Sequence, residues 1–348
     1  MAGRGDAPRP VAELLLPGLE GNAPVVAVAG APAPVPEGRR LELTGLDART
    51  ALVRQKTPHG RRAPWFDWSA NPYRGCEFGC GYCYARYSHG YLGHDDPRAF
   101  ERSIYVKSGF AQALRDDLRR VHPGDHIAFG TATDPYQPLE ERERVMLGAL
   151  RVLLAAEGLS ISITTKSALV ARDAALLARL AERHAVHVNF SVTTVDARLA
   201  RFLEPRAPTP QKRLEALATL HRHGVGAGVF LMPLLPGMTD SEADVDALVR
   251  AACEAGAERL GAQVVFLREP SRSHFLRELR RAYPRVAARY AWWTRTNSRL
   301  PGEVRDEAVR RVRAAAARHG LSMSGDGTPP RPRRPQQARF AFEVAADA

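Results

Sequence analysis

Strand-like and helix-like patterns alternate through the middle of this chain of 348 residues. Apolar runs of about four to eight residues predict strands, and apolar residues repeated at every third or fourth position predict helices. Repetition of strand, crossover helix and strand requires a parallel sheet. The predicted strands are residues 65–69, 126–130, 160–165, 186–193, 226–232 and 263–267, and the predicted helices are residues 110–120, 140–156, 173–184, 210–223 and 241–255. Thr239 and Glu242 predict a capping box before the last of these helices.

An active site is expected where these strands end. In parallel barrels and in open α/β sheets, the active site gathers at the carboxyl ends of the strands. Periodicity leaves open whether the sheet closes as an eight-stranded barrel, stays open or curls into a six-stranded partial barrel. The loops that follow the predicted strands are therefore the first places to search for functional residues.

Three cysteines follow the first predicted strand. Cys76, Cys80 and Cys83 lie within eight residues, in the run Asn-Pro-Tyr-Arg-Gly-Cys-Glu-Phe-Gly-Cys-Gly-Tyr-Cys. Three thiolates hold an iron–sulfur cube with one iron left open to a small molecule, whereas a structural cluster usually takes four cysteines. A structural zinc site is the alternative, with His89 or His94 as its fourth ligand.

Cysteine usage and hydropathy bear on the compartment. The remaining cysteine, Cys253, is distant in sequence and falls in a predicted helix, where its simplest role is that of a small buried residue. A chain of this size with so few cysteines is not a disulfide framework. The longest apolar runs are interrupted by proline and glycine, so no membrane segment is expected. These features favour the reducing cytoplasm.

The cysteine run resembles the signature of the radical S-adenosylmethionine (SAM) enzymes, with Tyr82 just before the last cysteine. The resemblance implies a partial (β/α)6 parallel barrel, a [4Fe-4S] cluster held by Cys76, Cys80 and Cys83, and SAM bound to its open iron beside Tyr82. It also implies reductive cleavage of SAM to a 5′-deoxyadenosyl radical, which abstracts a hydrogen atom from a substrate. A reductase such as flavodoxin or ferredoxin would supply the electron.

Further motifs resemble the spore photoproduct lyase-like (DNA repair photolyase-like) group within that superfamily. They are Tyr-Cys-Tyr-Ala-Arg, Thr-Asp-Pro-Tyr-Gln-Pro, Thr-Lys-Ser and Leu-Glu-Pro-Arg, spread between Asn71 and about Pro270. The resemblance implies that Lys166 and Ser191 contact SAM. The alternatives are a solvated lysine and an ordinary core hydroxyl.

Two other strand ends are candidates for SAM contacts. Asp134 offers a carboxylate to the amino group of SAM, although the Gly-Gly-Glu common in the superfamily is missing; the alternative is that Asp-Pro only begins a turn. After the fifth predicted strand, Met232 or Leu234 would line an adenine pocket if these residues are not simply part of the core.

The chain departs from the lyase at one decisive place. The lyase carries a cysteine hydrogen donor near the end of its second strand, and residues 130–136 of this chain contain no cysteine. Only Tyr136 or Cys253 remains as a donor, so photoproduct repair is not expected. The sequence predicts a radical SAM enzyme with an unknown substrate, for which a nucleic acid is one candidate. The alternatives are a zinc-stabilised nucleic-acid-binding module without catalysis and a radical enzyme acting on a peptide or small metabolite.

Positive charge is high and concentrates toward the C-terminus. The formal net charge is +12, and arginines recur from Arg277 to Arg313 around Trp292 and Trp293. Arginine beside aromatic rings grips phosphates and stacks on bases, which favours DNA or RNA as a partner. The alternative is that the arginines form the wet face of helices and the tryptophans belong to the core. Arg74 and Arg86 flank the cysteines and either stabilise an anionic cluster or are ordinary surface charges.

Composition divides the chain into four parts. Residues 1–60 form an Ala/Pro-rich N-terminal extension that is expected to be partly disordered. The resemblance assigns residues 61–270 to the radical SAM partial barrel, and residues 271–321 are expected to form an Arg-rich helical C-terminal region. Residues 322–348 are rich in proline, glycine and arginine and are expected to be a mobile basic tail.

Overall fold

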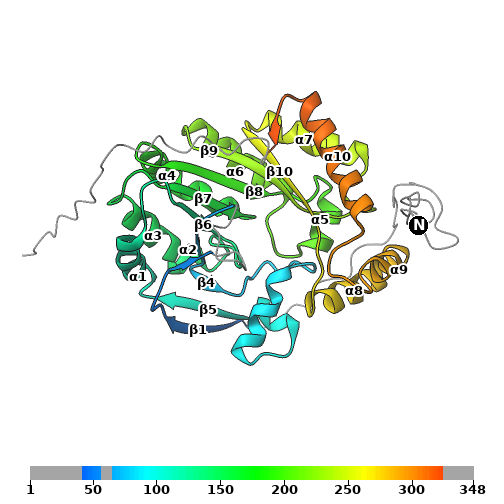
Figure 1. Cartoon of the computed structure of the whole chain (residues 1–348), viewed down its shortest axis with the longest axis horizontal. Coiled ribbons are helices and arrows are strands. Elements are labelled where there is room, and N and C mark those ends of the chain that lie inside the picture. The colour runs from blue at the N-terminus through cyan, green and yellow to red at the C-terminus, as the bar shows by residue number, and fades with distance from the viewer. Residues whose placement is uncertain (1–40, 56–64, 324–348) are drawn as a thin grey trace, which may run out of the picture.

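The computed structural model describes residues 41–55 and 65–323. Its main sheet has eight strands in the order β11-β10-β9-β8-β7-β6-β3-β2, and all neighbouring pairs are parallel except β2 and β3 (Figure 1). The α/β fold with a mostly parallel sheet is therefore confirmed. The strands are β2 (Leu52–Arg54), β3 (Trp68–Ala70), β6 (His126–Phe129), β7 (Ser160–Thr165), β8 (Ala185–Ser191), β9 (Gly226–Leu234), β10 (Arg259–Val264) and β11 (Ser322–Met323).

Each of the six predicted strands overlaps one of β3, β6, β7, β8, β9 and β10. The pattern is clearest in β7, where Ile161, Ile163 and Thr165 are buried and alternate with half-buried residues. The prediction of β10 was displaced, because its first half, Arg259 to Gly261, lacks the β-branched residues that mark a strand. This half of β10 is a strand because it pairs with β9, a long-range contact that the local sequence does not reveal.

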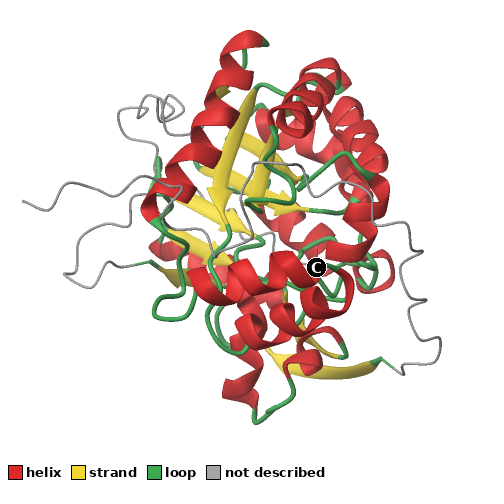
Figure 2. Ribbon diagram, turned by 90° about the vertical axis from the view of Figure 1, so that its right-hand side faces the viewer, coloured by secondary structure: helices red, strands yellow, loops and turns green. Residues whose placement is uncertain are grey.

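Helices connect the parallel strands and lie alongside them in Figure 2. The crossover helices are α1 (Phe110–Asp117), α2 (Glu140–Glu143), α3 (Val145–Leu153), α4 (Ala174–Ala181), α5 (Ala197–Leu203), α6 (Pro210–Arg222) and α7 (Glu242–Glu254), with short 3₁₀-helices η4 (Leu118–Arg120) and η5 (Ala168–Asp173). The helix predicted for residues 140–156 is broken at Arg144, which has a positive φ of 51°. The predicted capping box is wrong, because Ser241 caps α7 by accepting the Asp244 N–H and Thr239 lies outside the helix.

A second, smaller sheet lies beneath the main one in Figure 1 and has the strand order β1-β5-β4. Its strands are β1 (Glu42–Asp47), β4 (Tyr73–Arg74) and β5 (Ser103–Ser108), and the 3₁₀-helices η2 (Tyr84–Leu92) and η3 (Pro97–Glu101) lie between β4 and β5 in sequence. The sheet was not predicted, because β1 is largely exposed and lacks a buried face. Strands β1 and β2 fall within the part of the chain expected to be an N-terminal extension.

Three helices follow β10: α8 (Ser271–Ala282), α9 (Pro284–Trp293) and α10 (Gly302–Arg318). Trp293 is buried and packs its ring against Tyr290, so it belongs to the core, whereas Trp292 is half-buried beneath Arg295. Arg277, Arg280, Arg281 and Arg285 are exposed.

Several expectations fall outside the described residues. They concern residues 1–40 and 56–60 of the N-terminal extension and residues 324–348 of the basic tail. No helix in the part of the chain that the structure describes is long and apolar enough to cross a membrane.

Candidate active site

A cavity of about 370 Å³ lies at the carboxyl ends of the strands. The ends of β7, β8, β9 and β10 and the segments after β6, β7 and β10 line it, together with the loop that carries the three cysteines. All seven residues predicted for the site line this cavity: Cys76, Cys80, Cys83, Tyr82, Asp134, Lys166 and Ser191. The structure thus brings together residues that are up to 115 positions apart in sequence, because parallel strands place their carboxyl ends at one edge.

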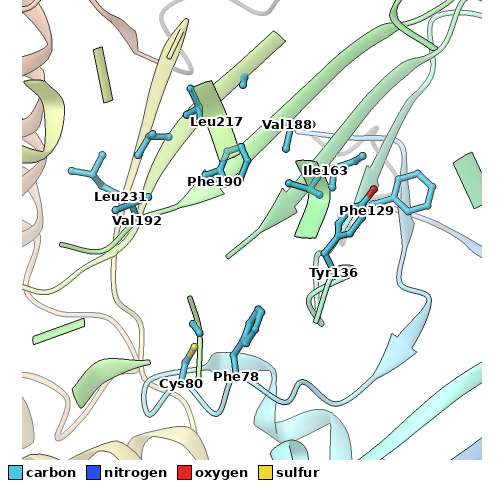
Figure 3. Close-up of a cluster of buried hydrophobic side chains, with 14 of the residues drawn as sticks. Phe78, Cys80, Phe129, Tyr136, Ile163, Val188, Phe190, Val192, Leu217 and Leu231 are labelled. Carbon is cyan, nitrogen blue, oxygen red and sulfur yellow. The ribbon is translucent and has the colours of Figure 1, made fainter. Parts of the chain in front are cut away.

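The cysteine loop (residues 76–83) is held by backbone hydrogen bonds, both within the loop and to the 3₁₀-helix η3. The Cys76 N–H donates to the Phe100 carbonyl over 2.8 Å, and the Cys83 N–H donates to the Cys80 carbonyl over 3.2 Å. Figure 3 shows Phe78 and Cys80 projecting from the loop toward the strand ends. Burial raises the pKa of all three thiols, that of Cys80 to about 12, so these cysteines release protons when they bind a metal.

The donor set fits an iron–sulfur cluster with one open position. Three thiols line a single cavity, while His89 and His94, the two candidate fourth ligands of a zinc site, do not line it. His89 Nε2 lies 2.8 Å from the Ser103 carbonyl, and His94 Nε2 lies 2.7 Å from the Tyr105 hydroxyl. Among residues 41–55 and 65–323, no group of three or more His, Cys, Asp or Glu side chains converges as for a metal ion. The fit therefore rests on the shared cavity and on the chemistry of three soft donors.

Asp134 joins the ends of β6 and β7. Its Oδ1 accepts the Thr165 hydroxyl over 2.6 Å and the Tyr136 N–H over 2.9 Å, and its Oδ2 accepts the Lys166 N–H over 2.7 Å. Burial raises the pKa of Asp134, although these hydrogen bonds oppose the rise. The turn expected at Asp-Pro is thus present, and the same carboxylate also lines the cavity.

Gly130 makes this junction of strands possible. A Cβ at Gly130 would lie 2.3 Å from the Thr164 carbonyl oxygen, and its φ of +84° is one that other residues rarely adopt. Glycine is thus required where β6 ends against β7.

A buried network of charges joins the cysteine loop to the strands, and the sequence had not assigned it a role. Glu204 is 1% exposed and accepts hydrogen bonds from the Tyr82 hydroxyl and, over 2.8 Å, from the Thr193 hydroxyl. It forms ion pairs with Arg213 on α6 and with Lys166, whose Nζ lies 3.9 Å from Glu204 Oε1. Burial raises the pKa of Glu204, but the charges of Arg213 and Lys166 outweigh it and lower the pKa, so the group is a carboxylate.

The segment around Glu204, residues 203–206, also forms hydrogen bonds with the cysteine loop. The Arg206 N–H donates to the Phe78 carbonyl over 3.2 Å, and Arg206 Nε donates to the Glu77 carbonyl. The Leu203 carbonyl accepts the Gly81 N–H over 3.1 Å. The Leu-Glu-Pro-Arg motif carries these contacts, so that motif was the only sequence signal for them.

The β9 and β10 side of the cavity is apolar. Phe230, Met232, Val264 and Phe266 line it, whereas Leu234 is fully buried outside the lining. Of the two candidates for an adenine pocket, the structure therefore places Met232 at the cavity.

The two arginines beside the cysteines differ. Arg86 is buried and donates to the Cys80 carbonyl over 2.8 Å and to the Pro97 carbonyl over 2.9 Å, and it pairs with Glu101. Arg74 is exposed. Arg86 is therefore not a surface charge but part of the packing that supports the loop.

Comparison with known proteins agrees with this geometry. The model of the radical SAM superfamily matches residues 70–249. The chain belongs to the radical SAM superfamily. Uncharacterized proteins of Mycobacterium bovis and Mycobacterium tuberculosis are each 36% identical over 276 residues, covering 79% of this chain and 81% of each relative. An uncharacterized protein of Methanocaldococcus jannaschii is 27% identical over 203 residues, covering 58% of this chain and 71% of that protein.

Solved structures extend the similarity of fold. A spore photoproduct lyase mutant with bound AdoMet and dinucleoside spore photoproduct has a TM-score of 0.59 and 14% identity, with 81% of both chains covered. A second lyase complex with the dinucleoside photoproduct has a TM-score of 0.57 and 15% identity over the same shares. The radical SAM fold is thus shared, and this chain is a radical SAM enzyme.

Neither candidate hydrogen donor of this radical SAM enzyme lines the cavity. Tyr136 is fully buried, and its hydroxyl donates to Asp173 over 3.1 Å. Cys253 is exposed on α7, so the expectation of a buried residue was wrong: its place in an amphipathic helix did not reveal which face it occupies.

Proposed function

We propose that this radical SAM enzyme holds a [4Fe-4S] cluster at Cys76, Cys80 and Cys83 and binds SAM in the adjoining cavity. The observation that carries the proposal is that the three thiols and the four candidate SAM contacts line one cavity. A cluster held there by the three cysteines would supply the electron for reductive cleavage of SAM and so for radical chemistry on a substrate. A reductase such as flavodoxin or ferredoxin reduces the cluster.

Polar residues of the cavity would bind the methionine end of SAM, and apolar residues would bind its adenine. The Lys166 ammonium is positioned to pair with the carboxylate of the methionine end, and Asp134 Oδ2 has a second lone pair for its amino group. The Ser191 hydroxyl offers a further polar contact, and Met232 and Phe266 provide an apolar surface for adenine. The volume of about 370 Å³ lies within the range of small-molecule sites.

A nucleic acid is the substrate class favoured by the aromatic rings of the cavity lining and by the tyrosines and arginine of the segments next to them in sequence. Tyr84 and Phe266 line the cavity with ring centroids 5.1 Å apart, and Arg268 lies 4.3 Å from the ring centroid of Tyr87. Tyr91 is 79% exposed and meets the edge of Tyr87. Exposed rings beside a guanidinium suit bases and phosphates. The lyase structures hold a dinucleoside photoproduct.

Anaerobic reconstitution with iron and sulfide tests the cluster. We expect about four irons per chain and formation of 5′-deoxyadenosine with dithionite or flavodoxin as reductant. Cys80→Ala should abolish both, while the control Cys253→Ala, at the exposed cysteine, should leave both unchanged. Tight retention of zinc without 5′-deoxyadenosine would instead support a zinc-stabilised binding module.

Oligonucleotide binding measured against salt tests the substrate class. About six phosphate contacts give a slope near −5 in a plot of log affinity against log salt for duplex DNA. Arg268→Gln should weaken binding about tenfold, and Arg54→Gln, which removes an arginine stacked over Trp68 on the opposite edge of the sheet, should not. Weak, salt-independent binding would favour a peptide or a small metabolite.

A further inference from the structure

We propose that Glu204 is a positioning residue that holds the Lys166 ammonium in the cavity wall and orients Tyr82 between two of the cysteines. The inference rests on the proposed function, because the ligand that Lys166 would meet is the carboxylate of SAM. Glu204 itself is not among the residues that line the cavity. Its effect on the ligand must therefore pass through the residues that it holds.

Four separate elements meet at this one carboxylate. Tyr82 comes from the cysteine loop, Lys166 from the end of β7, Thr193 from the segment after β8, and Arg213 from α6. Loss of the carboxylate would leave none of these contacts intact.

The same network reaches Ser191, another of the four candidate SAM contacts. Arg213 donates to the Ser191 carbonyl over 2.8 Å, so the network also fixes the end of β8 at the cavity. Lys166 Nζ lies 5.9 Å from the ring centroid of Tyr82 and 3.9 Å from Glu204 Oε1, so its ammonium is near both groups. Three cavity residues, Tyr82, Lys166 and Ser191, are thus tied to Glu204 directly or through one arginine.

The network around Glu204 contains more positive than negative charge, so the single carboxylate of Glu204 has two cations to balance. Lys166 and Arg213 carry two positive charges against the single negative charge of Glu204, which leaves a net charge of about +1 in a nearly dry place. Without the carboxylate, two buried cations would face each other. A buried lysine in that position loses its proton or turns toward solvent, whereas arginine stays charged. The positive charge offered by Lys166 therefore depends mainly on Glu204, with a smaller contribution from the Asp134 carboxylate.

A double-mutant cycle separates positioning from a merely structural role. Binding of SAM is measured on the anaerobically reconstituted wild type, Lys166→Met, Glu204→Gln and the double variant. Each single substitution should weaken binding of SAM about tenfold, which is about 1.4 kcal/mol and close to the contribution of one charge-assisted hydrogen bond. The double variant should lose less than the sum of the two single losses, because part of the effect of Glu204 passes through Lys166. Additive losses would overturn the proposal.

The control Glu215→Gln makes the same chemical change at an exposed position of α6 and should leave binding unchanged. Iron content should be equal in all five proteins, which shows that the cluster is not the cause.

A second measurement needs neither cluster nor SAM. The chain has four lysines, so reductive methylation with a ¹³C label gives few NMR signals. Lysine-to-arginine variants assign the signal of Lys166. Glu204→Gln should lower the pH at which Lys166 titrates, and Arg213→Met should raise it, because one removes the partner and the other removes a competing cation. An unchanged titration in either variant that folds would overturn the proposal.

If wild type fails to bind SAM but these opposite shifts appear, the proposed function fails and the positioning role stands.

Discussion

The two walls of the cavity differ in kind. The wall formed by the cysteine loop and the ends of β6, β7 and β8 carries Asp134, Lys166 and the thiols, with Glu204 and Arg213 buried behind it. The residues that β9, β10 and the turn after β10 place on the other wall include no ionisable side chain: they are Phe230, Met232, Pro233, Gln263, Val264, Val265 and Phe266.

This difference corresponds to two kinds of binding. Buried charges that are paired and hydrogen-bonded fix the orientation of a polar ligand, but they are costly to disturb. Apolar side chains contribute affinity in proportion to the area that they cover, and they tolerate change more readily. Substitutions in the charged wall should therefore have larger effects than substitutions in the apolar wall, and only the charged wall should respond to pH.

The largest expected effect on the fold is that of Arg213→Met. The side chains of Arg213 and Glu204 are 2% and 1% exposed, so the substitution leaves a buried carboxylate with only the more distant Lys166 as its counter-charge. Removal of one partner of such a pair costs about 3–5 kcal/mol in the free energy of unfolding. Urea denaturation of the protein without cluster measures the loss. Arg222→Met, at an exposed position on the same helix, should cost less than about 0.5 kcal/mol. Equal losses in the two variants would remove the distinction between buried and exposed charge.

A smaller effect is expected from Met232→Ala on the apolar wall. The substitution removes part of the surface assigned to adenine, so SAM should bind about three- to tenfold more weakly. The loss should not depend on salt, and iron content should stay the same. Met238→Ala changes a half-buried methionine outside the cavity lining and should leave the affinity for SAM unchanged. A loss as large as that from Lys166→Met would show that the apolar wall is no more tolerant than the charged one.

The smallest effect concerns acid stability and should arise behind the cysteine loop. His274 on α8 is buried, and burial together with the nearby Arg86 and Arg277 lowers its pKa to about 3. Because an unfolded chain binds this proton near pH 6.5, acid favours unfolding as the pH falls from about 6.5 toward 3, and the stability is fully present above 6.5.

His274→Phe should therefore reduce the difference between the unfolding free energies measured at pH 7.5 and at pH 5.5. The control is His223→Phe, at an exposed ring. If His274→Phe left the pH difference unchanged, this histidine would not be a source of acid sensitivity.

The sequence alone located much of the charged wall but little of what supports it. The cysteines, Lys166 and Ser191 stand in short motifs at the ends of strands with clear apolar patterns, so local chemistry and periodicity were sufficient to find them. Glu204 follows α5 and Arg213 lies in α6, where a solvated face is the ordinary expectation for a charged residue. Arg86 was equally ambiguous. The neighbouring sequence does not distinguish a buried charged residue from an exposed one.

The amino-acid sequence by itself indicated a parallel sheet, the three candidate cysteine ligands and the family of the chain, because each shows in short stretches of sequence. The tertiary structure decided which charges are buried, because burial depends on segments that meet only after folding. It placed Glu204 against Tyr82 across 122 positions and closed the cysteine loop with Arg206. It also put Tyr136 and Cys253 outside the cavity, since the side of an element that a residue faces is fixed by packing and not by its motif.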